Sequence, residues 1–159
     1  MIPPPSTMVD WPKGLRRYLA ASTAFHLAWE VLQLPLSTIW SEPWHTQAFA
    51  LLQCTIGDLM IAGLSLLVAL ALIGEAHWPQ SGLRLAWLIL LGLGVGYTLY
   101  SEWLNVSVRQ SWSYGPLMPT LPVISTGLAP LAQWFVIPTL VLRAAAGRWP
   151  WRQPGASRQ

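Results

Sequence analysis

The sequence predicts an all-α fold, a four-helix transmembrane bundle whose N-terminus and C-terminus are both cytoplasmic. Of the 159 residues, 53% are hydrophobic and only 9% are charged, whereas about a quarter of the residues in an average soluble domain are charged. Three long runs contain no Asp, Glu, Lys or Arg, and they cover residues 59–74, 85–101 and 110–142. Each run lies within a longer apolar stretch that can cross the roughly 30 Å of hydrocarbon in a bilayer.

The first half of the chain contains two predicted helices. Residues 1–16 are rich in proline, and we expect an irregular interfacial segment there. The first helix is predicted over 17–40, with a kink at Pro35 because proline removes one backbone donor. A short aromatic loop follows, and the second helix is predicted over 47–73.

The second half of the chain contains two more predicted helices, which follow a turn containing Glu75 and His77. A loop rich in proline and aromatic residues separates them, and Pro138 is expected to kink the last helix. The helices are predicted over 84–108 and 125–146, so the transmembrane domain covers 17–146 and a polar cytoplasmic tail covers 147–159.

Basic residues decide the predicted orientation, since Lys and Arg near helix ends are retained on the cytoplasmic side. Only Arg109 would lie on the opposite side, and no basic patch alternates with aromatic residues, so we expect no nucleic-acid partner. The compact size and short tails favour a bacterial inner membrane. Eight of the nine basic residues would be cytoplasmic: Lys13, Arg16, Arg17, Arg84, Arg143, Arg148, Arg152 and Arg158.

Polar side chains inside the predicted helices are the strongest indication of a functional site. A carboxylate in hydrocarbon costs roughly 2.5–3.5 kcal/mol on insertion scales, so such groups need partners inside the bundle. Spacings of three or four residues place both members of a pair on one helix face. Three pairs have this spacing: His26 with Glu30, Cys54 with Asp58, and Glu102 with Asn105.

The three acids are predicted to lie in one layer. At about 1.5 Å per residue, they fall roughly 20 to 27 Å from the cytoplasmic helix ends. With one histidine among three acids, we expect at least one carboxyl to be protonated or bound to a cation. The candidate catalytic residues are His26, Glu30, Asp58 and Glu102. Cys54 and Asn105 are candidate ligand-binding residues, and Cys54 is the only cysteine, which excludes an intrachain disulfide.

Several of the eleven tryptophans lie inside the predicted helices rather than at the membrane interface. Packing is their default role, since a buried indole is chiefly apolar surface. The alternative is an aromatic pocket for an apolar ligand or a developing cation, and Trp29, Trp103 and Trp134 are the candidates for it. Gly92, Gly94 and Gly96 form a small-residue face that is expected to let another helix approach closely.

Other interpretations of these patterns remain open. The polar pairs are also compatible with a purely structural network or with a path for protons or ions. A metal site is weakly indicated, because helical metal sites favour duplicated Glu-x-x-His pairs and this chain has no second intramembrane histidine. We therefore predict no bound metal and no cofactor.

Four short patterns resemble the emopamil-binding protein and sigma-2 receptor group, the EXPERA superfamily. The similar elements are His26-Leu-Ala-Trp-Glu30, Cys54-Thr-Ile-Gly-Asp58, Tyr97-Thr-Leu-Tyr-Ser-Glu102 and Trp134-Phe-Val-Ile-Pro138. Leu131 stands where the isomerase pattern has Asn, three residues before the Trp. The resemblance implies a unit of four transmembrane helices that binds or isomerises a sterol-like molecule.

The leading functional hypothesis is a membrane-embedded enzyme or binding protein for an apolar, lipid-like or isoprenoid molecule that enters from the bilayer. In the enzymatic version His26 and Glu30 shuttle a proton, while Asp58 and Glu102 assist them. One alternative is proton or cation transport, which would require a homodimer. Another is an accessory subunit of a larger membrane complex.

Overall fold

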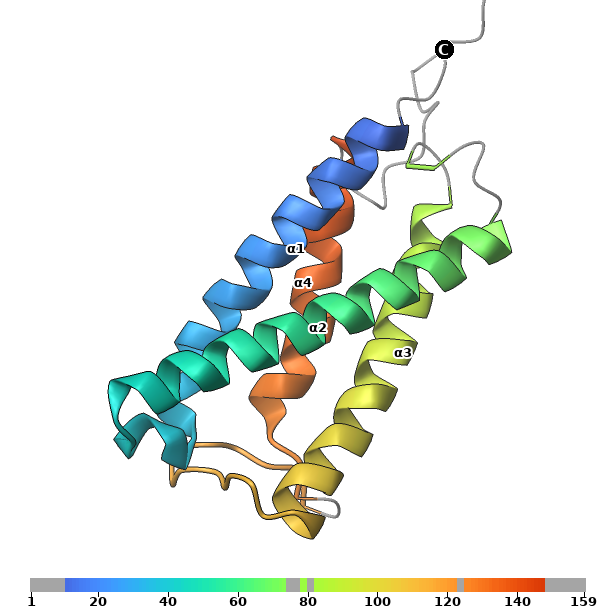
Figure 1. Ribbon diagram of the computed structural model, residues 1–159. Helices are drawn as coiled ribbons and strands as arrows, with labels where there is room; N and C mark the ends of the chain where they lie inside the picture. The colour runs from blue at the N-terminus through green and yellow to red at the C-terminus, as the bar shows by residue number, and fades with distance from the viewer. Residues whose placement is uncertain (1–10, 74–77, 80–81, 123–124, 148–159) are drawn as a thin grey trace, which may run out of the picture.

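The chain forms four α-helices that pack in a ring. The computed structural model describes residues 11–73, 78–79, 82–122 and 125–147. Helix α1 packs against α2 and α4, and α3 packs against the same two helices. The described residues contain no β-strand, so the predicted all-α four-helix bundle is confirmed (Figure 1). The helices are α1 (Trp11–Gln33), α2 (Trp44–Ile73), α3 (Leu83–Glu102) and α4 (Leu128–Ala146).

The helices alternate in direction, which gives the bundle two different ends. The terminal end contains the start of α1, the end of α4 and the α2–α3 connection (Figure 1). The loop end contains the α1–α2 and α3–α4 connections. Helix α2 is inclined to the other helices and diverges from α3 toward the loop end.

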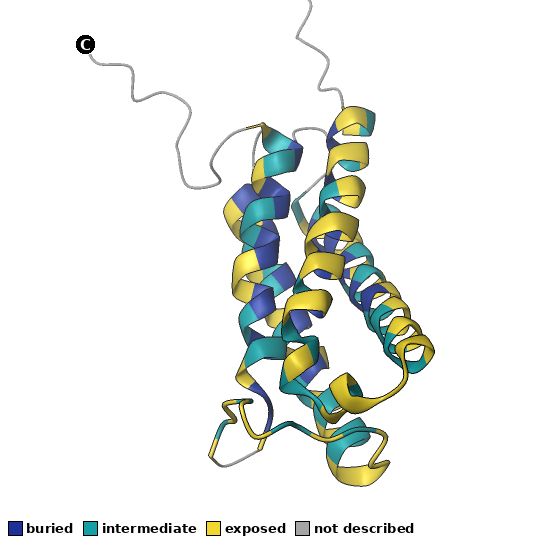
Figure 2. Ribbon diagram, turned by 90° about the vertical axis from the view of Figure 1, so that its left-hand side faces the viewer, coloured by how far each residue is buried: buried dark blue, intermediate teal, exposed yellow. Residues whose placement is uncertain are grey.

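Within the described residues, three helical segments are long and apolar enough to cross a membrane: α2, the segment Leu83–Val108 and α4. Helix α1 is not among them, because its buried face is polar and its first turns are basic. Ser22, His26 and Glu30 are buried there, whereas Phe25 and Leu32 are among its exposed apolar side chains. The exposed yellow stripes on the helices in Figure 2 therefore include large apolar side chains, the pattern of a surface that faces lipid.

The first helix differs from its predicted range at both ends. Its described part already begins at Trp11, six residues before the predicted start at residue 17. It ends at Gln33, so Pro35 terminates the α-helix and does not kink it. Two short 3₁₀ helices follow, η1 (Leu34–Leu36) and η2 (Thr38–Ser41).

The later helices also depart from prediction at their ends. Helix α2 begins at Trp44, immediately after a proline, rather than at residue 47. The predicted helix over 84–108 is α3 followed by a π-helical turn, η4 (Trp103–Val108). Helix α4 begins three residues later than predicted, because Ser125 has a φ of 50° and Gly127 is extended.

Some predicted features lie outside the described residues. These are the first ten residues of the N-terminal interfacial segment, residues 148–159 of the tail, and Glu75 and His77 in the turn between α2 and α3.

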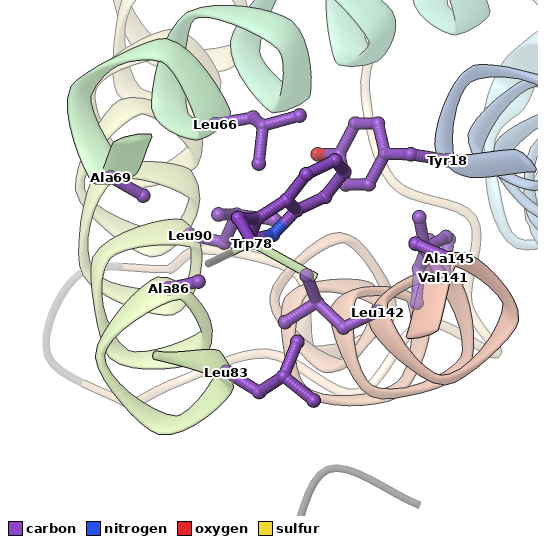
Figure 3. Close-up of a cluster of buried hydrophobic side chains, with 11 residues drawn as sticks. Tyr18, Leu66, Ala69, Trp78, Leu83, Ala86, Leu90, Val141, Leu142 and Ala145 are labelled. Carbon is purple, nitrogen blue, oxygen red and sulfur yellow. The ribbon is translucent and has the colours of Figure 1, made fainter. Parts of the chain in front are cut away.

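The half of the bundle near the terminal end is a closely packed apolar core. Trp78 and Leu142 are at most 1% exposed, and the ring of Tyr18 lies edge-on to that of Trp78 with 6.4 Å between centroids (Figure 3). The Tyr18 hydroxyl donates to the carbonyl of Ala62 at 2.9 Å, so its polar atom is satisfied. Side chains from all four helices join this cluster: Tyr18, Leu66, Ala69, Leu83, Ala86, Leu90, Ile137, Val141, Leu142 and Ala145.

Candidate functional site

The other half of the bundle contains a partly open cavity of about 800 Å³. Its walls are the end of α1 with η1 and η2, the first half of α2, the end of α3 with η4, the loop residues 111–118 and two residues of α4. The lining thus includes the parts of α2 and α3 that diverge toward the loop end in Figure 1. A volume of this size is within the range of small-molecule sites in proteins.

The three predicted acids line this single cavity although they come from three different helices. They are Glu30 of α1, Asp58 of α2 and Glu102 of α3. Glu30 and Asp58 are 7% and 9% exposed, and Glu102 is half-buried. The carboxyl of Glu30 interacts electrostatically with those of both Asp58 and Glu102. The structure thus brings together the acids that the sequence placed in one layer.

The histidine lies behind the cavity wall and faces Asp58. Its Nδ1 is 3.4 Å from Oδ2 of Asp58, and neither of these buried atoms has a hydrogen-bond partner. Glu30 lies one turn away on the same helix, but its Oε1 accepts a hydrogen bond from Nε2 of Gln33 at 2.7 Å. The closest described acid–histidine pair is therefore His26 with Asp58, and not the expected pair of His26 with Glu30.

A tryptophan packs against the histidine. The ring centroids of Trp134 and His26 are 5.4 Å apart, and Trp134 is fully buried. Its Nε1 donates to Oγ1 of Thr98 at 2.7 Å. A Cβ atom added at Gly94 would lie 2.1 Å from the indole, so the ring rests directly on the backbone of α3. Trp134 therefore packs behind the site and does not line the cavity.

The third acid is held by the loop between α3 and α4. The Tyr114 hydroxyl donates to Oε2 of Glu102 and accepts a hydrogen bond from the N–H of Gly127 at 2.8 Å. Partial burial and the bond to Glu102 raise the pKa of Tyr114 above its ordinary value, which keeps the donating phenol form. The same loop is joined to η1 by a hydrogen bond of 2.8 Å from the N–H of Gly115 to the carbonyl of Leu36.

The remaining predicted ligand-binding residues take different positions. Cys54 and Asn105 line the cavity, but the Asn105 amide donates to the Ser101 carbonyl at 2.9 Å and not to an acid. Trp29 packs against the apolar core and donates to the Ala129 carbonyl at 3.2 Å. Trp103 is 53% exposed and faces outward.

Four polar residues of the site were missed as site residues by the sequence analysis: Gln33, Thr98, Tyr114 and Gln133. Gln33 follows Glu30 by three residues, and this spacing is a usable signal. Thr98 and Gln133 stand alone among apolar neighbours, so nothing local marks them. Tyr114 belongs to a loop, and its pairing with Glu102 depends on the tertiary fold.

Some polar groups of the cavity-lining residues are paired and others are not. Gln33 donates to Glu30, and Tyr114 donates to Glu102. Three buried acceptor atoms of lining residues have no partner: Oε1 of Gln33, Oδ2 of Asp58 and Oε1 of Gln133. A buried acceptor without a partner costs about 1–3 kcal/mol, so the fold bears a cost in stability for the polar side chains around this cavity.

Comparisons with known proteins give no assignment, because no family model, no curated protein and no solved structure matches the chain. Within the part of the chain that the structure describes, no group of three or more His, Cys, Asp and Glu side chains has an arrangement that could hold a metal ion.

Proposed function

We propose that this chain is a multi-pass membrane protein that binds a lipid-like amphiphile in the cavity, with the polar end of that molecule against Glu30, Asp58 and Glu102. The observation that carries the proposal is the convergence of three carboxyl side chains from three helices on one cavity. A hydroxyl or protonated amine on the ligand would donate hydrogen bonds to these carboxyl groups. Apolar wall residues such as Phe49, Ile61 and Met118 suit the rest of the molecule.

The proposal includes α1 as a fourth membrane span with both termini cytoplasmic. Helix α1 packs against two helices that are apolar enough to span, and it carries apolar side chains on its exposed face. The described basic residues at the terminal end are Lys13, Arg16, Arg17, Arg84 and Arg143, whereas Arg109 lies at the loop end. This distribution supports a cytoplasmic terminal end.

The reaction that suits the site best is isomerisation of a double bond by proton transfer, which the resemblance to the EXPERA superfamily also suggests. One carboxyl would add a proton to a carbon of the double bond, and a second carboxylate would take a proton from a neighbouring carbon. The double bond then migrates with no net change in protons or electrons. Asp58 lines the cavity, and His26 lies behind it at 3.4 Å, so the imidazole is placed to return a proton to Asp58.

The test is lipid extraction from the protein purified in a mild detergent, followed by mass spectrometry. We expect one amphiphile to co-purify with the wild type at close to one molecule per chain. It should be lost at least about tenfold in Glu30→Gln, Asp58→Asn and Glu102→Gln, since each removes a charge-assisted partner of about 1.5–3 kcal/mol. The matched control is Glu42→Gln, which removes a carboxylate at the rim of the same cavity and should retain the amphiphile.

Two results would contradict this proposal. If the folded wild type retains only the common lipids of its host membrane, in the same proportions as in that membrane, the cavity binds no specific amphiphile. If liposomes containing the protein pass protons steadily and the flux depends on Asp58, the transport alternative is correct.

A further inference from the structure

Helix α3 is linked to the His26–Asp58 pair through a side chain of α4. Four helices meet in a single chain of contacts, which begins with Gly94 and Thr98 of α3. It continues through Trp134 of α4 and His26 of α1 to Asp58 of α2. Thr98 and Asp58 line the cavity, whereas Trp134 and His26 lie behind its wall.

The two α3 residues fix the indole in complementary ways. Gly94 has no Cβ, so the indole of Trp134 can lie against the backbone of α3. A Cβ added at Gly94 would be 2.1 Å from Cε3 and 2.2 Å from Cδ2 of the indole. Thr98 lies one turn further along the same face and accepts the only N–H of the ring at 2.7 Å. Gly92 and Gly96 have open space where a Cβ would stand, so Gly94 alone among these three glycines makes this contact.

The fixed indole in turn restricts the imidazole. The rings of Trp134 and His26 lie 5.4 Å apart and are tilted by 54°, and both residues are at most 1% exposed. The imidazole Nδ1 then faces Asp58 at 3.4 Å, although no hydrogen bond to Nδ1 holds it there. Packing against Trp134 is thus one contact that opposes rotation of the ring away from Asp58.

We propose that Thr98 is a positioning residue, which sets the distance between His26 and Asp58 through its hydrogen bond to Trp134. Loss of the acceptor frees the indole to rotate on Gly94, and the imidazole follows it. This inference rests on the proposed function for its biological meaning, but the placement of His26 is measurable without any ligand.

The experiment compares Thr98→Val, which keeps the side-chain volume and removes the acceptor, with Thr98→Ser, which keeps the acceptor. Both are made in protein labelled with ¹⁵N in tryptophan and histidine, and the resonances are assigned with Trp134→Phe and His26→Gln. In the Val variant, we expect the Trp134 indole N–H to exchange with solvent deuterium about five- to tenfold faster, as loss of one hydrogen bond implies. The ring nitrogens of His26 should shift, whereas in the Ser variant both signals should stay at their wild-type positions.

The outcomes separate this inference from the proposed function. Unchanged His26 resonances in a folded Val variant would overturn the positioning role, as would equal shifts in the Val and Ser variants. If the Val variant does not fold, Thr98→Ala replaces it, because it also removes the acceptor, leaves the Trp134 ring in place and should likewise shift the His26 resonances. Retention of the amphiphile should fall about tenfold in the Val variant, and failure to find any amphiphile would refute the proposed function while leaving the resonance result intact.

Discussion

The same four helices build two halves that differ in what they bury. Near the terminal end, Trp78, Leu90 and Leu142 are buried among other apolar side chains. Near the loop end, α2 and α3 diverge, and the space between them holds three carboxyls and several amides and hydroxyls. The half near the terminal end, the apolar half, has the composition of a hydrophobic core. The half near the loop end, the hollow half, contains the cavity and retains polar groups whose burial lowers stability.

This difference predicts that mutations in one half affect mainly the stability of the protein, whereas mutations in the other affect mainly ligand binding. Substitutions in the apolar half should lower the free energy of unfolding, because they leave cavities in a packed interior. Substitutions of carboxyls in the hollow half should leave folding nearly unchanged and remove ligand binding. Such a division is common where an active site is built at the expense of stability.

The largest effect is expected for Trp78→Ala in the apolar half. Trp78 is 1% exposed and packs against Tyr18, so truncation should cost about 3–5 kcal/mol of unfolding free energy. The measurement is unfolding by sodium dodecyl sulfate in mixed micelles, followed by circular dichroism. Trp44→Ala is the control, because Trp44 is 79% exposed, and it should change stability by less than about 0.5 kcal/mol. Equal losses in the two variants would show that burial does not distinguish the sites.

A smaller loss of stability is expected for Gly94→Ala, which tests the contact between Gly94 of α3 and Trp134 of α4. The added Cβ would overlap the Trp134 indole, and overpacking of this kind costs about 1–3 kcal/mol. Gly92→Ala adds the same methyl group on α3 where nothing lies within 4 Å, and it should be neutral or slightly stabilising. The same micelle titration measures both, and a neutral Gly94→Ala would mean that the indole does not lie on α3.

Tyr114→Phe should have a local effect on the loop end. It removes the donor to Glu102 and the acceptor for the Gly127 N–H, two bonds worth about 1 kcal/mol each. We expect limited proteolysis within residues 111–122 to become about tenfold faster, while the half of the bundle near the terminal end resists cleavage as in the wild type. Tyr97→Phe alters an exposed tyrosine of α3 and serves as the control. A cleavage rate equal to that of the wild type would show that the Tyr114 hydroxyl does not hold the loop.

The smallest change in stability is expected for Glu30→Gln. The substitution keeps the side-chain shape and an oxygen that accepts from Gln33, while it removes one of three neighbouring carboxyls. Stability should stay equal or rise by about 1 kcal/mol in the micelle titration, even though the amphiphile is lost. A loss of more than about 2 kcal/mol would instead assign Glu30 to a structural network.

The sequence was sufficient to predict the helical bundle and the convergence of its acids. Long uncharged runs predict spans from composition alone, and carboxyls placed within or beside them have few stable positions except the interior. The ends of the helices were harder to predict. Pro35 was expected to kink a helix that ends before it, and residues 11–16 belong to α1 although their proline content suggested an irregular segment.

The pairing inside the site could not be predicted, because it depends on the rotation of each helix about its axis. The spacing of His26 and Glu30 correctly gave a common face, but that face also meets α2, and Asp58 lies nearer to the imidazole Nδ1. Trp103 is adjacent in sequence to Glu102 yet points outward, since neighbouring residues on a helix face about 100° apart. The roles of Tyr114 and Thr98 depend on contacts with residues 12 and 36 positions away.

The position of the single cysteine has a practical consequence. Cys54 is half-buried in the wall of the cavity, and the sequence contains no other thiol. A thiol-reactive spin label or fluorophore directed at Cys54 would therefore meet no competing cysteine, and the chain needs no prior removal of background thiols. The spectrum of the label would report directly on the polarity and occupancy of the space between α2 and α3.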